Sequence, residues 1–412
     1  MTSQKVVLEV NALTKIFGSH PKRAYPLLKQ GASKEEILQE TGLTVGVHNA
    51  SFTVYEGEIF VIMGLSGSGK STLVRMLNRL IEPDLGSVIM QGKDITAMTH
   101  DELVQFRLHN MSMVFQSFAL MPHLSVIDNA AFGLELAGIA KSERYKRARQ
   151  ALEQVGLAEW ENAYPDQLSG GMQQRVGLAR GLAVDPDIML MDEAFSALDP
   201  LIRTEMQDEL LKLQEKYRRT IIFISHDLNE ALRIGDRIGI MQGGKVIQVG
   251  APEDVLQNPA NEYVRAFFKG VDPTSVLTAS DIATDTYPTI IISKGGNLRT
   301  SHEILSASER DHGFVLDPNH KFQGVVSTDS INEKMEENIP SNTLRDAFLP
   351  DVFTVKATDS MQDILPLVAQ SKSPVPVLDD NHTFKGVVSK SRFLKTLHRT
   401  AEVMDETETI EQ

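Results

Sequence analysis

The residues GLSGSGKS, at positions 64–71, form the clearest candidate for chemistry in this sequence of 412 residues. They match the phosphate-loop pattern G-x-x-x-x-G-K-[ST] at every defined position, between an expected strand at 59–63 and an expected helix. Glycines let backbone N–H groups face phosphate oxygens, and the helix N-terminus adds partial positive charge. We expect Lys70 to reach the β- and γ-phosphates and the Ser71 hydroxyl to bind Mg²⁺. The predicted nucleotide contacts are Gly64, Ser66, Gly67, Ser68, Gly69, Lys70, Ser71 and Thr72.

Two carboxylates supply a second candidate for chemistry in the stretch IMLMDE, at 188–193. Its four apolar residues predict a buried strand, so the carboxylates emerge at the C-terminal end, where α/β sheets bind ligands. We expect Asp192 to hold Mg²⁺, directly or through water, and Glu193 to polarise an attacking water as general base. An acidic strand end without a role is the alternative, which the neighbouring phosphate loop disfavours.

The elements that must position these residues alternate between strand-like and helix-like segments. Short apolar runs at 59–63, 187–193 and 220–226 predict buried strands of a largely parallel sheet in an α/β domain. An unusual segment, 20–47, precedes the phosphate loop. Within it, Ser33 and Glu36 predict a capping box and Gly42 a helix end. The alternative to a functional role is that this insertion is a surface segment that only packs on the domain.

Composition narrows the classes of protein. Lys and Arg number 41 against 55 Asp and Glu, a net charge of −14, which disfavours binding of nucleic acid by bulk charge. The absence of cysteine excludes disulfides, zinc–thiolate sites and a cysteine nucleophile. We find no apolar stretch long enough to span a bilayer and no signal-peptide pattern at the N-terminus. We therefore expect any membrane role to be peripheral, through a partner.

Further motifs carry a resemblance to a known family. LSGGMQQRVGLARGLA at 168–183 is similar to the ABC signature, and AFSALDP at 194–200 to the D-loop. Gln116 stands at the Q-loop position and His226 at the switch-histidine position, so residues 1–270 resemble a P-loop ABC-type ATPase domain of α/β fold. One departure is Met172, where the signature commonly has Gln. The resemblance implies ATP and Mg²⁺ as cofactors, with Gln116 among the magnesium ligands.

The resemblance also implies a dimer. In this family the phosphate loop of one copy faces the signature of another, and this chain has one of each. Two copies arranged head to tail would enclose two ATP molecules, with His226 at the γ-phosphate. The residues expected to act across the interface are Ser169, Gly170, Gly171 and Asp199. Adenine usually stacks on an aromatic residue upstream of the phosphate loop, which is Phe17 here, with Tyr25 of the insertion as the alternative.

The closest resemblance is to ATPase subunits of ProU-type glycine betaine/L-proline importers, and it covers nearly the whole chain. It implies ATP hydrolysis coupled to uptake of glycine betaine, proline betaine or proline, a permease that contacts 117–136, and a periplasmic substrate-binding protein. It places the chain at the cytoplasmic face of the inner membrane. We consider two alternatives: a soluble ABC ATPase acting on DNA or ribosomes, and a sensor whose ATPase half is inactive. The net negative charge and the importer-like residues 117–136 disfavour the first alternative. The presence of Lys70 and Glu193, which ATP hydrolysis needs, disfavours the second.

The second part of the chain contains a repeat. VLDPNHKFQGVVS at 315–327 matches VLDDNHTFKGVVS at 377–389 in 10 of 13 positions. We place a domain boundary after 270 and expect units at about 279–336 and 343–400 that pack as a pair. They resemble a tandem CBS (α+β) regulatory pair, which implies regulation by osmotic or ionic conditions. Such pairs often bind adenine nucleotides, but the ribose-binding Asp of that family is replaced here by Ser330 and Arg392. A purely structural or dimerising role is the alternative. Residues 401–412 predict an acidic tail.

Overall fold

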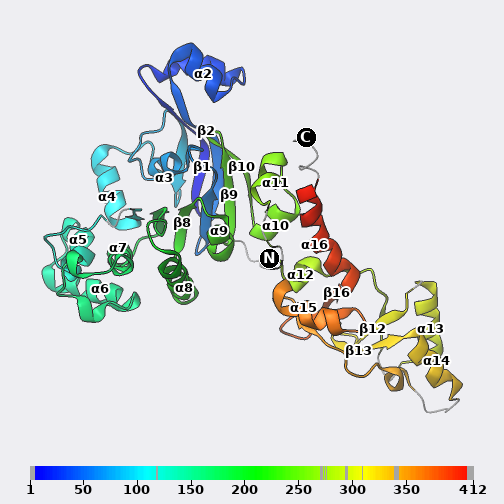
Figure 1. The fold of residues 1–412 in the computed structure, drawn as a ribbon. Coiled ribbons are helices and arrows are strands. Elements are labelled where there is room, and N and C mark those ends of the chain that lie inside the picture. The colour runs from blue at the N-terminus through cyan, green and yellow to red at the C-terminus, as the bar shows by residue number, and fades with distance from the viewer. Residues whose placement is uncertain are drawn as a thin grey trace. The chain divides into compact units, whose positions relative to one another are not determined.

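A computed structural model describes residues 5–116, 119–269, 272, 274, 276–292, 296–308, 310–337 and 343–405, with side-chain surroundings up to 397 (Figure 1). The chain divides into two compact units, Met1–Arg265 and Ala266–Gln412, whereas the sequence placed the boundary after 270. Of the expected acidic tail, 406–412 lie outside the described residues. So do 117 and 118 of the expected permease contact.

The first unit is built on a six-stranded sheet in the order β10-β9-β3-β8-β7-β6. All neighbours are parallel except the antiparallel pair β9–β10, which confirms the predicted parallel sheet. Each residue of β3 and β7 is buried, as the apolar runs predicted. The strands are β3 (Ile59–Met63), β6 (Met111–Val114), β7 (Ile188–Asp192), β8 (Thr220–Ser225), β9 (Arg237–Gln242) and β10 (Lys245–Gly250).

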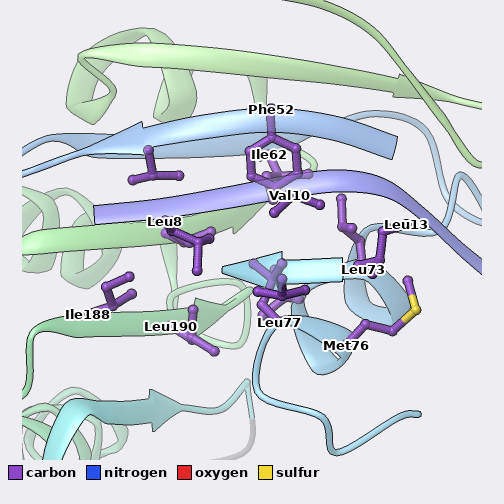
Figure 2. Packing of buried hydrophobic residues seen from close by; sticks show 14 of the residues in the cluster. Leu8, Val10, Leu13, Phe52, Ile62, Leu73, Met76, Leu77, Ile188 and Leu190 are labelled. Atoms are coloured by element: carbon purple, nitrogen blue, oxygen red, sulfur yellow. The ribbon is translucent and has the colours of Figure 1, made fainter. Parts of the chain in front are cut away.

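A second, antiparallel sheet in the order β2-β1-β4-β5 shares its core with the first. Its strands are β1 (Val6–Phe17), β2 (Thr44–Tyr55), β4 (Leu85–Met90) and β5 (Lys93–Asp94). Helix α3 (Lys70–Leu77) buries Leu73 and Leu77 in this common cluster, and Figure 2 shows them near side chains of β1 and β7. Full burial of one such side chain is worth about 1.5–3 kcal/mol, so the cluster fixes the helix that begins at the phosphate loop.

Helices complete the first unit. In Figure 1, α5, α6 and α7 gather on one side of the unit, and they pack on one another. Ser125 caps α5 and Ser169 caps α7, each accepting a hydrogen bond from a backbone N–H of its first turn. The helices are α4 (His100–Asn110), α5 (Val126–Leu136), α6 (Lys141–Gln154), α7 (Gly170–Ala183), α8 (Pro200–Tyr217), α9 (Leu228–Ile234), α10 (Pro252–Gln257) and α11 (Glu262–Phe267).

The inserted segment folds into η1 (Pro21–Ala24), α1 (Tyr25–Lys29) and α2 (Lys34–Thr41) at the end of the β1–β2 pair (Figure 1). The predicted capping box is confirmed: Ser33 accepts from the N–H of Glu36, and the Glu36 side chain accepts from the N–H of Ser33. Gly42 ends the helix in the left-handed conformation, as predicted. The strand β2 begins at Thr44, so the last residues of the expected insertion, 44–47, belong to the sheet.

The second unit contains two three-stranded sheets, β11-β12-β13 and β14-β15-β16, of the same topology. In each, the first pair of strands is parallel and the second antiparallel. The elements are α12 (Ala279–Ile282), β11 (Thr289–Ile291), α13 (Leu298–Ala307), β12 (His312–Leu316), β13 (Phe322–Ser327), α14 (Thr328–Glu336), η5 (Leu344–Ala347), β14 (Val355–Lys356), α15 (Met361–Gln370), β15 (Val375–Leu378), β16 (Phe384–Val388) and α16 (Lys390–Asp405).

The two repeats exchange their opening elements, which the repeat pattern did not predict. The N–H of Ala279, at the start of the first repeat, donates to the carbonyl of Asp359 in the second. Conversely, Leu344 of the second repeat is buried in the core of the first. Phe314 stacks on Phe384 with ring centroids 5.6 Å apart, so the repeats share an apolar interface. Each repeat therefore depends on the other for a complete core.

Candidate functional site

The phosphate loop lies between β3 and α3, as its pattern predicted, and two glycines make its path possible. Gly64 and Gly69 have φ of 151° and 103°, in the region that glycine tolerates best. A Cβ on Gly64 would lie 2.3 Å from the carbonyl oxygen of Met241, and one on Gly69 would lie 2.4 Å from that of Gly46. Side chains at these positions would therefore push the loop away from the strands that hold it.

Lys70 is buried at the first turn of α3. Its Nζ donates to the carbonyl oxygens of Gly64 at 2.9 Å and Leu65 at 3.3 Å, so the side chain curls back over the loop. Desolvation lowers the pKa of Lys70, and the negative charges of Glu193 and Asp192 partly offset this effect. The Lys70 ammonium is therefore close enough to both carboxylates to be affected by their charge. The buried Ser68 hydroxyl finds no hydrogen-bond partner among the described residues.

Asp192 and Glu193 stand at the C-terminal end of β7, where the sequence placed them. Asp192 is only 5% exposed, and one of its oxygens lies 3.2 Å from Nη2 of Arg75 on α3. Glu193 adopts φ of 49°, which is uncommon for a residue with a side chain and turns the chain sharply after the strand. Arg75 escaped the sequence analysis because an arginine inside a helix carries no signal of its tertiary partner.

A chain of contacts joins Glu193 to His226, expected at the γ-phosphate, and to Gln116, expected as a magnesium ligand. Oε2 of Glu193 lies 3.5 Å from Nδ1 of His226, whose side chain is about half exposed. The amide of Gln116 donates to Oγ of Ser196 at 3.0 Å, and Ser196 donates to the Glu193 carbonyl at 2.9 Å. Ser196 was not singled out from the sequence, although it lies within the D-loop stretch. It fastens the expected Q-loop residue to the carboxylate turn.

A buried polar network lies behind His226 and holds the start of α9. Ser225 donates through Oγ to Oε2 of Glu230 at 2.5 Å, and Gln207 of α8 donates to Oε1 of Glu230 at 3.1 Å. Burial raises the pKa of the Glu230 carboxyl, while these two hydrogen bonds lower it by less. The network connects α8, which follows the D-loop, to the turn that carries His226.

A cavity of about 900 Å³ brings most of the expected nucleotide contacts together. Phe17 lines it, and a Cβ on Gly46 would lie 2.6 Å from the Phe17 ring. Tyr25, the alternative, packs in the core of the insertion, and its hydroxyl donates to the carbonyl of Asp84 at 3.4 Å. The expected residues that line the cavity are Phe17, Gly64, Ser66, Gly67, Gly69, Lys70, Ser71, Thr72, Glu193 and His226. The cavity therefore favours Phe17 as the aromatic platform.

The expected signature and D-loop residues form a separate group. Ser169 caps α7 and Asp199 caps α8. A Cβ on Gly171 would lie 2.6 Å from Ile202 of α8, so the two caps stand side by side. Within the described residues, neither these caps nor Gly170 line the cavity that contains Lys70. In one copy, the expected signature and D-loop residues therefore lie outside the cavity that contains the phosphate loop.

The residues present suit Mg²⁺. Ser71, Gln116 and Asp192 offer hydroxyl, amide and carboxylate oxygens, which are the ligands that magnesium prefers. Among the described residues no cluster of three or more His, Cys, Asp or Glu side chains could hold a metal by itself. A magnesium ion here would depend on the phosphate oxygens of a nucleotide as well.

The fold and this site define an ABC-type ATPase, and comparisons with known proteins agree. The ABC transporter family model matches residues 47–196, and the CBS domain model matches 344–399. A solved dimeric structure of the ATP-binding cassette MJ0796, in a post-hydrolysis state bound to ADP and Pi, is similar with a TM-score of 0.50 and 31% identity. That similarity covers 59% of this chain and 98% of the other.

Relatives that match along nearly their whole length show which ABC family the chain belongs to. The glycine betaine/proline betaine transport system ATP-binding protein ProV of Salmonella typhimurium is 54% identical over 96% of this chain and 98% of its own length. The glycine betaine transport ATP-binding protein OpuAA of Bacillus subtilis is 47% identical over 99% and 96%. The chain belongs to this family of ABC transporter ATP-binding subunits, ATPases coupled to transport, and its ABC domain binds nucleotide. No helix in the described part of the chain is long and apolar enough to cross a membrane.

Proposed function

We propose that this chain hydrolyses ATP to energise import of a compatible solute through a partner permease. The solutes that the relatives suggest are glycine betaine, proline betaine or proline. Two observations together support the proposal. The chain is similar to betaine transport subunits along nearly its whole length, and the phosphate loop lines one cavity with Glu193 and His226. The soluble alternative and the inactive-sensor alternative each explain only part of this combination.

The cavity suggests a role for each residue in hydrolysis. The backbone of the phosphate loop and Lys70 would bind the phosphates of ATP, and Phe17 would stack on adenine. Glu193 would accept the proton of the attacking water, and His226, within 3.5 Å of that carboxylate, would hold the γ-phosphate in line. Mg²⁺, held by Ser71, Gln116 and Asp192, would neutralise charge on the phosphates.

We propose that the working unit contains two copies. The cavity of one copy is not lined by the signature and D-loop residues of that copy, which are Ser169, Gly170, Gly171 and Asp199. These residues are therefore available to complete the cavity of a second copy. A head-to-tail pair would enclose two Mg-ATP, and the dimeric form of a similar cassette supports this arrangement. Closure of the pair would drive the permease, and hydrolysis would reopen it.

We place the chain at the cytoplasmic face of the inner membrane, held by the permease. The described part of 117–136, which includes α5, would receive the permease, and a periplasmic protein would deliver the solute. We also propose that the CBS pair regulates activity under osmotic or ionic stress. The residues at the ribose position argue against a nucleotide in that pair: the Ser330 hydroxyl accepts from the N–H of Ser327 in the capping box of α14, and Nε of Arg392 donates to the carbonyl of Ile282 at 3.4 Å.

Co-purification with the permease tests this function. A tagged copy, expressed together with the permease of the same transport system, should bring down the permease from detergent-solubilised membranes. A matched sample expressing the Lys70→Ala variant should do the same, because Lys70 lies in the nucleotide cavity and outside the proposed permease contact. Recovery of ribosomes or DNA in place of a permease would contradict the proposal.

A further inference from the structure

The inserted segment forms one wall of the nucleotide cavity, a role that none of the ABC motifs assigns. Three residues of α2 line the cavity together with the phosphate loop and Phe17: Lys34, Glu35 and Leu38. The insertion has a small core of its own, in which Ile37 is fully buried, so α2 is anchored against β1 and β2. Its capping box fixes where the helix begins. The wall is therefore a fixed part of the cavity.

The ammonium of Lys34 lies beside the backbone that supports the phosphate loop. A Cβ placed on Gly244 would lie 3.0 Å from Nζ of Lys34 and 3.0 Å from the carbonyl oxygen of Gly46. The N–H of Gly244 donates to the carbonyl of Ser68 in the phosphate loop at 2.9 Å. The same Gly46 oxygen touches the position of a Cβ on Gly69. Lys34 thus places a positive charge beside the backbone of Gly244, which is hydrogen-bonded to the phosphate loop.

Lys34 has no carboxylate partner in the structure as described. It is partly buried, and no ion pair or side-chain hydrogen bond joins it to another described residue. Desolvation lowers the pKa of Lys34, and the neighbouring Glu35 charge offsets this effect only in part. A partly buried cation at a phosphate-binding cavity gains most from an anionic ligand.

Leu38 stands one turn after Lys34, so the two side chains share a face of α2. Half of its surface is exposed although Ile37, the adjacent residue, is buried. Of the three α2 residues that line the cavity, Lys34 supplies a cation, Leu38 an apolar side chain and Glu35 a carboxylate. A nucleotide has the matching combination of charged phosphates and a largely apolar base and ribose face.

We propose that Lys34 and Leu38 bind the nucleotide: Lys34 attracts its phosphates and Leu38 packs against its nucleoside. This inference rests on the proposed ATP site and adds to it two contacts from outside the ABC motifs. It also gives the insertion a role in ATP affinity, where packing alone was the alternative.

Calorimetric titration of the full chain with Mg-ADP tests the proposal, since ADP is not hydrolysed. Lys34→Gln should weaken ADP binding about threefold to tenfold, the range for losing one charge-assisted contact, while Lys34→Arg stays near the wild type. The matched control is Lys29→Gln, which removes a lysine of the same insertion that does not line the cavity. Thermal unfolding without nucleotide should be the same for all four proteins.

Two further measurements distinguish the Lys34 contact from the Leu38 contact. The Lys34→Gln defect should shrink at high salt, because salt weakens the attraction between a partly exposed lysine and phosphate, and it should be absent with adenosine as the ligand. Leu38→Ser should weaken ADP and adenosine by the same factor, with Glu40→Gln of the same helix as the control. ADP affinities equal to the wild type in both Lys34→Gln and Leu38→Ser would overturn the inference. Failure of the wild type to bind ADP would instead contradict the proposed function, and this inference with it.

Discussion

Replacement of Phe17 by alanine tests the nucleoside end of the proposed site. Phe17 is 39% exposed and lines the cavity, so removal of its ring should cost the fold little. Loss of a base–aromatic stack is worth about 1–3 kcal/mol, which corresponds to a loss of nucleotide affinity between about fivefold and 150-fold. Because the ring faces solvent in part before a nucleotide binds, we expect a value in the middle of that range.

The neighbouring glycine offers an independent perturbation of the same ring. A Cβ on Gly46 would lie 2.6 Å from Cε2 of Phe17, so Gly46→Ala should displace the ring without removing it. We expect Gly46→Ala to weaken ATP binding and to add little to the effect of Phe17→Ala when the two are combined. Equal effects in the double variant and the more affected single variant would show that both changes act through the ring.

Equilibrium binding of Mg-ADP, measured by calorimetry, is the assay for this series. Phe17→Tyr should retain affinity because it keeps the aromatic face. Tyr25→Phe should leave affinity unchanged, since it removes only the hydroxyl that donates to Asp84. Unchanged affinity in Phe17→Ala together with a loss in Tyr25→Ala, in a protein that still unfolds cooperatively, would refute the assignment of the stack to Phe17.

Three other predictions follow from the site. Glu193→Gln should retain ATP binding, lose nearly all turnover and trap a nucleotide-bound dimer, which size-exclusion chromatography with ATP detects; near-normal ATPase activity would contradict the general-base role. Ser196→Ala should lower kcat about twofold to tenfold, the value of one lost hydrogen bond holding Gln116, with little change in KM for ATP; a change in KM alone would point to a ground-state role. Burial raises the folded-state pKa of Glu230 above its ordinary value of about 4.5, so the folded state binds the proton more tightly than the unfolded state. The free energy of unfolding should therefore fall as pH rises from the ordinary pKa through the raised one. Glu230→Gln should remove that part of the pH dependence of thermal unfolding. Identical pH profiles for the variant and the wild type would exclude a contribution from the Glu230 carboxyl.

The sequence predicted the phosphate loop, the two strands beside it and the capping box of α2 because each depends on local chemistry. GLSGSGKS requires a strand, a glycine turn and a helix in that order, and an apolar run before Asp192 requires a buried strand end. In the same way, Ser33, Glu36 and Gly42 specify both ends of one helix without help from the rest of the chain.

What the sequence left open depends on tertiary packing. Lys34, Arg75 and Ser196 are ordinary residues of helices and turns, and only the fold brings them to Gly244, Asp192 and Gln116. The choice between Phe17 and Tyr25 needed the path of the insertion, which no pattern encodes. The exchange of opening elements between the two repeats is likewise invisible to a search for self-similarity, because each repeat keeps its own sequence while it packs on the other.

Solute uptake by reconstituted vesicles tests the central claim most directly. Vesicles would contain the chain with its permease, ATP on the side of the chain, and the solute-binding protein with radiolabelled glycine betaine on the other. We predict uptake that requires ATP, disappears in Glu193→Gln although the complex still assembles, and rises with the salt concentration on the side of the chain. ATP hydrolysis by the assembled wild-type complex without movement of glycine betaine, proline betaine or proline would contradict the account.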